Sequence, residues 1–421
     1  MRLIRILRYV SKNGYILLGV VMRKKVLFVI RELAGGGAER ALSNITMNFP
    51  KDWEIDLLMN NRDFIDFPYR GNLLSLDIPE PRSRKSVVHQ LWAIIKRMWR
   101  LKRLKREGHY DACISFLDSS NISNVLSGNK YCKTIISMRL SMTSEKSGLL
   151  YRVSALPLMK LLYNHADKIV AVSREIEQDA KARFHIPDEQ ITTIVNGYDV
   201  AKIAEQAQRK PENAMLFEGK RLVVTVGRLD SQKGQWHLIR AFSEVAAREP
   251  DALLCVVGTG DCEPYLKRLI ELYHLEKQVL LAGFSDNPFW YDAQAEVFVL
   301  PSMYEGFPNA LAEAICCGAP CIATDFHSGA REILAPEMDV MGAQVTEITE
   351  TSYGILTPLC SGTMYKGTEP LEVAEQQLAE AILLLLQDKE KNQHYRDQSL
   401  KRRDMLGIQA VVQDWIRVME E

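Results

Sequence analysis

Residues 301–314 read Pro301-Ser302-Met303-Tyr304-Glu305-Gly306-Phe307-Pro308-Asn309-Ala310-Leu311-Ala312-Glu313-Ala314 and directly follow the apolar run Val297–Leu300. The run has the length and composition of a buried strand, and the residues after Pro308 have those of a helix that stops at Gly318. A strand, a loop and a helix in this order predict one βα unit of a parallel sheet. Glu305 falls in the loop and Glu313 about one turn into the helix, so both carboxylates are expected near the same strand end.

Comparable βα units occur along most of the chain. Short apolar runs alternate with helical patterns in two consecutive series, which are separated by the polar stretch 206–220. The candidate strands are Val26–Ile30, Ile55–Met59, Ala112–Phe116, Thr134–Met138, Lys168–Val172 and Ile191–Val195 in the first series, and Arg221–Val226, Ala252–Val257, Gln278–Ala282, Val297–Leu300 and Pro320–Ala323 in the second. Two such series predict an α/β protein with two Rossmann-like domains that face each other across an interdomain cleft.

We expect four segments: a basic N-terminal segment (1–24), one Rossmann-like domain (25–200), a second one (201–400) and a C-terminal helix (401–421). Residues 340–372 are expected to form an excursion on the surface, before a helix at Ala374–Gln387. The last helix, Gln409–Met419, has apolar residues at helical spacing and must dock, and we expect it to pack back toward the N-terminal domain.

The N-terminal segment contains the apolar run Tyr15–Val21, which is too short to span a membrane. No small-residue cleavage site follows the run, so a secretory signal is not expected. Three interpretations remain: the segment is a basic stretch that lies at a membrane interface, it is a disordered N-terminal extension, or translation starts at Met22 rather than Met1.

The composition is that of a globular protein, because 47% of the 421 residues are hydrophobic and 25% are charged. Disordered, collagen-like and multi-span membrane classes are excluded. The formal net charge is zero, yet residues 1–199 carry 32 Lys and Arg against 20 Asp and Glu, and residues 200–421 carry 21 against 33. A basic half is joined to an acidic half, so the first half can still bind an anionic partner.

The eight cysteines lie mostly in apolar stretches and form no pair of Cys-x-x-Cys units. We expect them to be reduced and largely buried, in a cytoplasmic protein. Three of them are close in sequence, but a tetrahedral zinc site needs a fourth ligand and better spacing, so no metal is predicted. The cysteines are Cys113, Cys132, Cys255, Cys262, Cys316, Cys317, Cys321 and Cys360.

Two glycine-rich loops follow candidate strands. Gly35-Gly36-Gly37-Ala38-Glu39-Arg40 leads into a helix, where backbone N–H groups and the helix dipole favour a phosphate or another anion. The dinucleotide fingerprint Gly-x-Gly-x-x-Gly fails there at Arg40, and it fails in the loop 258–263 at Glu263. An NAD enzyme thereby loses its main sequence support. For both loops the alternative is a tight turn that needs glycine for a positive φ angle.

A second pair of candidates follows the strand 221–226 in the segment Gly227-Arg228-Leu229-Asp230-Ser231-Gln232-Lys233-Gly234. Arg228 and Lys233 would place a bidentate donor and a point cation where a diphosphate could bind. Taken alone, the segment could also be a solvated loop. Likewise, the carboxylates of Glu305 and Glu313 suit recognition of sugar hydroxyls. The alternative is that Glu305 lies in a solvated loop and Glu313 in the first helical turn, where the helix dipole favours acidic residues.

In combination these motifs resemble the retaining glycosyltransferases of family 4, which have the GT-B fold. The resemblance covers nearly the whole of residues 25–421, with the motifs in the expected order. It rests first on Glu305 and Glu313, which have seven residues between them, Gly306-Phe307-Pro308 included. The other motifs are Gly227-Arg228, Lys233-Gly234, Asn196-Gly197-Tyr198-Asp199 at the domain crossover, and Gly35-Gly36-Gly37 after the first strand.

The resemblance implies that the first domain binds the acceptor and that the second binds a nucleotide-sugar donor. Arg228 and Lys233 would bind the donor diphosphate, and Glu313 the ribose. Glu305 and the backbone of Gly306, Phe307, Pro308 and Asn309 would hold the donor sugar, while Gly36 and Gly37 would let the first loop approach donor and acceptor. Glu305, Arg228 and Lys233 are the candidate catalytic residues.

The family resemblance also implies a mechanism. Many members have a histidine beside the reacting centre, but the corresponding run 136–141 offers Arg139, which is the acceptor-side candidate. Front-face transfer with retention is implied, with the leaving diphosphate helping to deprotonate the acceptor hydroxyl. The protein would then supply positioning and charge stabilisation, with no metal or other cofactor. UDP is the expected nucleotide, and a hexose or N-acetylhexosamine the expected sugar.

The segment Arg82–Arg106 contains ten Lys and Arg and no acid. Apolar residues are interleaved at roughly helical spacing, and a basic amphipathic helix with tryptophans indicates association with an anionic membrane surface. The alternative is a core helix with a solvated basic face; nucleic acid is not an expected partner, since no recognised module accompanies the patch. The apolar residues are Val87, Val88, Leu91, Trp92, Ile94, Ile95, Met98, Trp99, Leu101 and Leu104.

Membrane attachment fits an acceptor that is itself a lipid-linked saccharide, such as a polyprenyl-diphosphate saccharide used in cell-surface polysaccharide synthesis. The protein would then be cytoplasmic and attached peripherally to the inner face of the plasma membrane. Two alternatives stay open: a catalytically silent nucleotide-sugar-binding subunit of a membrane assembly, and another GT-B enzyme such as an epimerase or a phosphorylase.

Overall fold

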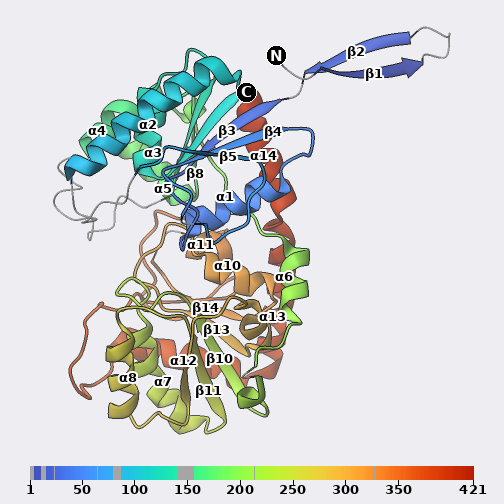
Figure 1. Cartoon of the computed structure of the whole chain (residues 1–421). Helices are drawn as coiled ribbons and strands as arrows, with labels where there is room; N and C mark the ends of the chain where they lie inside the picture. Colours follow the sequence, from blue (N-terminus) through green and yellow to red (C-terminus); the bar gives the residue numbers. More distant parts are fainter. Residues whose placement is uncertain are drawn as a thin grey trace.

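The computed structural model describes residues 4–10, 16–22, 24–63, 65–78, 87–139, 156–212, 214–326 and 329–421, and their side chains except in 4–10, 16–22 and 87–90. It consists of two stacked lobes, each built on a sheet flanked by helices (Figure 1). The long C-terminal helix runs along the N-terminal lobe, so the end of the chain returns to the lobe in which the first sheet lies.

The N-terminal domain contains a parallel sheet in the order β5-β4-β3-β6-β7-β8-β9. Its helices are α1 (Gly37–Asn48), α2 (Val87–Gly108), α3 (Asp118–Leu126), α4 (Leu156–Leu162) and α5 (Arg174–Phe184). Its strands are β3 (Lys25–Val29), β4 (Glu54–Met59), β5 (Asn72–Ser75), β6 (Ala112–Phe116), β7 (Lys133–Met138), β8 (Lys168–Ala171) and β9 (Ile191–Thr193). All six predicted strands are present within one or two residues, and only the short β5 was not predicted.

The C-terminal domain has a second sheet, in the order β12-β11-β10-β13-β14-β16-β15, in which only β15 runs antiparallel. Its helices are α7 (Gln235–Arg248), α8 (Glu263–Leu272), α9 (Phe289–Gln294), α10 (Asn309–Cys316), α11 (Ala330–Leu334) and α12 (Val373–Gln387). Its strands are β10 (Arg221–Val226), β11 (Ala252–Val257), β12 (Val279–Gly283), β13 (Val297–Leu300), β14 (Cys321–Thr324), β15 (Thr349–Glu350) and β16 (Ile355–Thr357).

In both sheets the first strand of the domain is the third of seven, with later strands added on either side. This is the doubly wound order, and ligands bind such sheets at the carboxyl ends of the strands where the order reverses. The reversal lies between β3 and β6 in the first sheet and between β10 and β13 in the second. The glycine-rich loop follows β3, the loop of Arg228 follows β10 and the loop of Glu305 follows β13, so all three lie at these points.

The prediction that residues 340–372 form a surface excursion is wrong for part of that segment. Ile355–Thr357 is a buried strand that pairs with β14, and its three residues are each fully covered. The segment returns to the sheet because a parallel sheet covered on both faces accepts a short apolar run as a further strand. The segment then ends at Glu372, which forms a capping box with Glu375 at the start of α12.

The N-terminal segment forms a strand pair that was not predicted. β1 (Ile4–Val10) and β2 (Ile16–Met22) pair antiparallel, with Ile4 opposite Met22, and project from the N-terminal lobe (Figure 1). Met1 and Tyr15 lie outside the described residues.

Three helices join the two domains: α6 (Val200–Ala207), α13 (Lys389–Met405) and α14 (Ile408–Glu420). The apolar face of α14 enters the core of the N-terminal domain, where Trp415 is fully buried and its ring lies 5.7 Å from that of Phe116. The chain crosses between domains before α6 and again before α14. These crossings pair, because the backbone N–H of Tyr198 donates to Leu406 O and that of Ile408 donates to Tyr198 O, each at 2.9 Å.

The close approach of the two crossings requires the glycine of the motif 196–199. A Cβ atom on Gly197 would lie 2.8 Å from Ile408 Cδ1 and 2.9 Å from Val411 Cβ. Among the described residues, no helix is both long and apolar enough to cross a membrane. The eight cysteines are free, and all are buried except Cys317, which is half-buried, as predicted.

Candidate functional site

The loops at the carboxyl edge of the second sheet are tied together by backbone hydrogen bonds. The N–H of Gly227 donates to Val257 O at 3.0 Å, that of Leu229 to Thr259 O at 2.9 Å, and that of Met303 to Gln232 O at 2.8 Å. The loop of Arg228 and Lys233 is therefore fixed between the loop after β11 and the loop of Glu305. Candidate residues from different βα units are thus held at one edge of the sheet.

Gly234 allows the loop of Lys233 to pass close to the loop of Glu305. It starts α7 with a left-handed φ of 65°, and a Cβ atom there would lie 2.2 Å from Pro301 O. Any residue other than glycine is disfavoured here for two reasons: the left-handed φ angle strains the backbone, and the side chain would clash with the Pro301 carbonyl oxygen. Gly234 therefore sets the approach that brings Lys233 to Glu305.

Lys233 and Glu305 form a buried ion pair. Lys233 Nζ lies 2.6 Å from Glu305 Oε1, and the side chains are 16% and 8% exposed. Ser302 Oγ donates to the same oxygen at 3.0 Å, while Gln232 Nε2 donates to Glu305 Oε2 at 3.1 Å and to Tyr304 O at 2.9 Å. Both carboxylate oxygens are thus held by donors, which fixes the carboxylate in one orientation.

Arg228 differs from Lys233 in being largely free to reach a ligand. Its side chain is 67% exposed, and one guanidinium nitrogen lies 3.2 Å from Asp230 Oδ2. An exposed pair of this kind is weak, so little is lost when the guanidinium turns to a stronger anion such as a diphosphate.

Glu313 lies deeper than Glu305 and is paired with a residue of the other domain. The Glu313 side chain is 4% exposed, and Arg40 Nη1 on α1 donates to its Oε1 at 2.6 Å. Burial raises the pKa of Glu313, and the neighbouring Arg40 opposes that rise. The sequence does not predict this partner, although Arg40 is the residue at which the dinucleotide fingerprint fails.

Asn309, the first residue of α10, connects the donor side to the glycine-rich loop. Its side-chain Oδ1 accepts hydrogen bonds from Asn196 Nδ2 at 2.7 Å and Tyr198 OH at 2.6 Å, and its Nδ2 donates to Gly37 O at 3.4 Å. A Cβ atom on Gly37 would lie 2.6 Å from Asn309 Nδ2, so glycine is needed for this approach. Asn196 and Tyr198 belong to the crossover motif, whose contact with Asn309 the sequence did not reveal.

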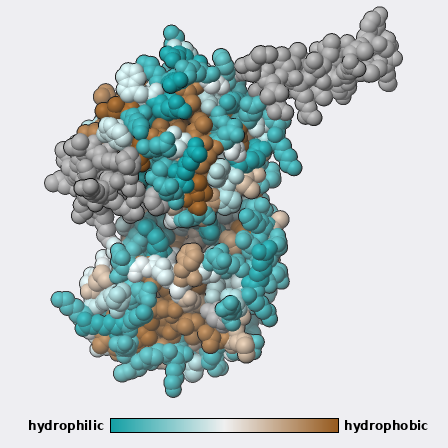
Figure 2. Space-filling model, viewed as in Figure 1, coloured by the Kyte–Doolittle hydropathy of each residue, from teal (hydrophilic) through white to brown (hydrophobic). Residues whose placement is uncertain are grey.

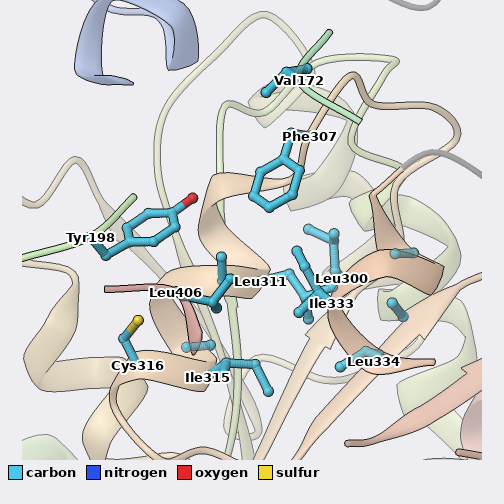
Figure 3. Packing of buried hydrophobic residues seen from close by; sticks show 14 of the residues in the cluster. Val172, Tyr198, Leu300, Phe307, Leu311, Ile315, Cys316, Ile333, Leu334 and Leu406 are labelled. Atoms are coloured by element: carbon cyan, nitrogen blue, oxygen red, sulfur yellow. The ribbon is translucent and has the colours of Figure 1, made fainter. Parts of the chain in front are cut away.

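The other residues of the Glu305 loop lie beside this contact. Phe307 is buried in the core cluster with Leu311 and Tyr198, and the three side chains are close together at the start of α10 (Figure 3). Pro308 precedes α10 as its N-cap, and Gly306 lies between Glu305 and the buried ring. Gly36 lies against Glu39, whose carboxylate would meet a Cβ atom at that position.

Arg139 lies in a buried polar network of the N-terminal domain. It is 8% exposed, donates to Ser137 Oγ at 2.9 Å and to Asn196 Oδ1, and its guanidinium lies 4.7 Å from the centre of the Phe116 ring. Burial lowers the pKa of Arg139 to about 10. Because Asn196 in turn contacts Asn309, Arg139 is linked to the donor side through two side chains. Leu140 and Ser141 lie outside the described residues.

Among the described residues, one cluster has atoms of the kinds that bind metals: His237, Cys360 and Glu372, all within 4.8 Å of one another. Its acceptor positions are already used. Gly362 N–H donates to His237 Nε2 at 3.1 Å, and Ser361 and Tyr365 donate to the carboxylate of Glu372. Burial also raises the pKa of the Cys360 thiol, which opposes the thiolate form that metals need. These contacts favour a structural role, in which the cluster holds residues 360–372 on α7.

The basic segment forms α2, but its cations do not all face solvent. Arg97 and Lys105 are each 1% exposed. Arg97 donates to Ser119 O at 2.9 Å and to Asn60 Oδ1 at 2.5 Å, and Lys105 donates to Asn124 O, Gly128 O and Thr134 Oγ1 at 2.7–3.1 Å. The expectation that these two belong to a solvent-facing basic surface is wrong. Arg82, Arg84 and Lys85 lie outside the described residues.

The apolar residues of α2 divide between two faces. Leu101 is buried and Leu104 packs against the core beneath it, whereas Leu91, Trp92, Ile95 and Trp99 are 44–63% exposed. Lys96 Nζ lies 5.1 Å above the Trp92 ring and Lys102 Nζ lies 5.9 Å above the Trp99 ring. We call Leu91, Trp92, Ile95, Trp99, Lys96 and Lys102 the outer face of α2. The viewed side of the N-terminal lobe shows hydrophobic residues among mostly hydrophilic ones (Figure 2).

Comparison with known proteins identifies the family. Residues 35–202 match the model described as Glycosyltransferase Family 4, and residues 206–345 match that described as Glycosyl transferases group 1. The Campylobacter jejuni N-acetylgalactosamine-N,N'-diacetylbacillosaminyl-diphospho-undecaprenol 4-alpha-N-acetylgalactosaminyltransferase is 28% identical over 343 residues, which are 80% of this chain and 90% of that protein. An uncharacterized glycosyltransferase of Methanocaldococcus jannaschii is 28% identical over 354 residues, which are 80% of this chain and 86% of that one.

Solved structures agree on the fold. Anabaena HepE in complex with UDP aligns with a TM-score of 0.69 at 17% identity, over 94% of this chain and 99% of that one. WaaG, a glycosyltransferase involved in lipopolysaccharide biosynthesis, aligns with a TM-score of 0.65 at 16% identity, over 94% and 99% of the two chains. The predicted fold class and enzyme class are both confirmed. The chain belongs to the family 4-like glycosyltransferases and has the GT-B fold.

Proposed function

We propose that this glycosyltransferase moves a hexose or N-acetylhexosamine, with retention, from a UDP-sugar to a lipid-linked saccharide in cell-surface polysaccharide synthesis. The observation that carries the donor part is the Lys233–Glu305 pair beside the exposed Arg228. A compact cation and a planar donor on one loop suit the two phosphates of a nucleoside diphosphate, while a fixed carboxylate suits the hydroxyls of a sugar.

The proposed chemistry needs little covalent participation from the protein. The bond from the anomeric carbon to the phosphate oxygen breaks, the acceptor oxygen bonds to that carbon on the same face, and its proton passes to the leaving phosphate. Lys233 and Arg228 stabilise the negative charge that develops on the diphosphate, which removes the need for a metal ion in that role. Glu305, oriented by Ser302 and Gln232, holds the sugar for attack.

The acceptor proposal draws on relatives whose names specify their substrates. The Campylobacter protein is named for a diphospho-undecaprenol saccharide acceptor. An Escherichia coli relative, 29% identical over 167 residues that cover 38% of this chain and 43% of that one, is named UDP-Gal:alpha-D-GlcNAc-diphosphoundecaprenol alpha-1,3-galactosyltransferase. We propose the same chemical class of acceptor, a diphosphate-linked polyprenyl saccharide.

A donor screen tests this function directly. UDP-, GDP- and ADP-sugars are incubated with the full chain and a short-chain polyprenyl-diphosphate saccharide, with and without EDTA. We expect transfer from a UDP-hexose or UDP-N-acetylhexosamine, unaffected by EDTA, and an α-linked product when the donor is α-configured. UDP binding without transfer to any acceptor would instead indicate a catalytically silent subunit.

We further propose that the outer face of α2 attaches the protein to the cytoplasmic face of the plasma membrane. Exposed tryptophans flanked by lysines suit the interface between headgroups and acyl chains of an anionic bilayer. Each cation near such a surface contributes about 1 kcal/mol before screening by salt. Attachment would bring the site to acceptors that cannot leave the membrane.

Vesicle flotation tests the attachment. We expect the protein to float with anionic vesicles and the double variant Trp92→Ala/Trp99→Ala to stay at the bottom of the gradient. The matched control is Met215→Ala/Leu216→Ala, which removes two residues of the C-terminal domain that are 79% and 59% exposed. Flotation of the tryptophan variant at the level of the unmodified protein would contradict the proposal.

A further inference from the structure

Arg40 reaches out of the N-terminal domain to a residue of the donor domain. It lies in the first turns of α1, yet its Nη1 donates at 2.6 Å to Glu313 Oε1 on α10. Its guanidinium lies 5.6 Å from the ring of Phe67 in the N-terminal domain and 5.8 Å from that of Phe289 on α9. Arg40 is thus held between aromatic side chains of both domains, at the place where α1 faces α10 (Figure 1).

The position of Glu313 makes this partner important. A carboxylate that is 4% exposed is costly to keep charged unless a cation lies beside it. Among the described residues, the Arg40 contact uses Oε1 alone, and Oε2 stays available as an acceptor for a hydroxyl group. Arg40 and a ribose can therefore use the same carboxylate without competing for one oxygen.

The other charged and titratable groups around Glu313 do not replace Arg40. Lys233 acts on Glu313 through space but forms its short contact with Glu305. Asp292 on α9, Tyr198 of the crossover, and Cys316 and Cys317 at the end of its own helix are acids, and the charge of Glu313 adds to the burial that raises their pKa values. Burial raises the pKa of Asp292 well above its usual range, so that residue adds a neutral carboxyl group. Arg40 is the cation in hydrogen-bond contact with Glu313 among the residues that the structure describes.

We propose that Arg40 is a positioning residue for the nucleotide: from the N-terminal domain it holds the Glu313 carboxylate in place for the ribose, so that the donor domain binds a nucleoside diphosphate fully only when α1 contacts α10. The proposal rests on the proposed role of Glu313 in ribose binding. It makes nucleotide affinity depend on the arrangement of the two domains, and it gives the glycine-rich motif a role in donor binding through Arg40.

The test is the affinity for UDP, measured by calorimetry on the full chain at pH 6.5, 7.5 and 8.5. The proteins compared are the unmodified protein, Arg40→Ala, Arg40→Lys, Glu313→Gln and the double variant Arg40→Ala/Glu313→Gln. We expect Arg40→Ala to bind UDP about tenfold more weakly at pH 7.5, because the buried carboxylate loses its partner. Without Arg40 the pKa of Glu313 rises further, so this loss should shrink as the pH rises. Arg40→Lys should restore part of the affinity.

Two further comparisons separate positioning from a general structural effect. In the Glu313→Gln background, Arg40→Ala should weaken UDP binding little further, because Arg40 acts on the nucleotide through the Glu313 carboxylate. The loss should also vanish for 2',3'-dideoxy-UDP, which lacks the ribose hydroxyls. Arg417→Ala is the matched control, because Arg417 is 68% exposed in a surface pair with Asp414, and it should bind UDP normally.

The outcomes distinguish this inference from the proposed function. If Glu313→Gln weakens UDP binding while Arg40→Ala binds UDP as tightly as the unmodified protein, or more tightly, the inference is wrong and the donor site stands. The inference would also be wrong if Arg40→Ala and Glu313→Gln each weakened UDP binding and their effects were additive in the double variant. If Glu313→Gln binds UDP normally, the ribose assignment fails, and the inference fails with it.

Discussion

Replacing Lys233 with alanine is expected to lower kcat/KM for the nucleotide sugar by about 10²–10³-fold, or about 3–4 kcal/mol, while the protein stays folded. Two effects combine in this loss. The diphosphate loses a cation that stabilises its developing charge, and the carboxylate of Glu305, which is 8% exposed, loses the partner 2.6 Å away that helps to orient it. Initial rates with saturating acceptor give the change, and circular dichroism checks the fold.

A surface lysine of the same domain provides the control. Lys267 is 61% exposed and pairs with Glu263 one turn away on α8, so Lys267→Ala should transfer sugar at the unmodified rate. Arg228→Ala should also lower turnover strongly, because that guanidinium is the second donor to the diphosphate. Unmodified rates in both Lys233→Ala and Arg228→Ala would show that this loop does not bind the diphosphate.

The largest effect on stability is expected from Trp415→Ala. Trp415 is fully buried and anchors α14 in the core of the N-terminal domain, where it packs on Phe116. Truncating a buried tryptophan leaves a cavity and typically costs about 3–5 kcal/mol. We expect the N-terminal domain to unfold at a clearly lower denaturant concentration, as followed by urea titration with probes in each domain.

Trp99→Ala is the control for this substitution. The Trp99 side chain is 63% exposed on the outer face of α2, so its removal should change the stability by no more than about 0.5 kcal/mol. Equal stability losses for Trp415→Ala and Trp99→Ala would contradict the assignment of α14 to the core of the N-terminal domain.

The sequence predicts the regular part of this fold well, because its signal is local. Apolar runs such as Ala112–Phe116 and Arg221–Val226 coincide with β6 and β10. Within the two domain sheets, two of the missed strands are short: Asn72–Ser75 is half-exposed, and Ile355–Thr357 has three residues in a polar segment. Runs of three or four residues carry too little periodicity to be told from a loop.

The sequence also does not show which charged residues are buried. From sequence, Arg97 and Lys105 are two of ten equivalent cations in a basic segment. In the structure both are buried, because carbonyl oxygens of α3 and of its neighbouring turns accept their hydrogen bonds. Lysine and arginine are rarely buried without such partners, and partners supplied by other segments leave no trace in local spacing.

The candidate site shows the same division between local and distant information. Lys233, Glu305 and Gly234 lie in motifs that the sequence displays, and their meeting follows from the shared edge of one sheet. The contact between Arg40 and Glu313 joins residues 273 positions apart in different domains. It depends on how the domains face each other, which no pattern within either motif specifies.

The paired crossings at Tyr198 and Leu406 limit how the two halves of the molecule can rotate. A single covalent connection would permit torsion about its own bonds, whereas two connections that are hydrogen-bonded to each other resist torsion and leave bending about the line between them. Tyr198 lies on that line and bonds through its hydroxyl to Asn309. We therefore expect the start of α10, which is close to that line, to move least if the two domains bend relative to each other, and groups farther from the line to move through wider arcs.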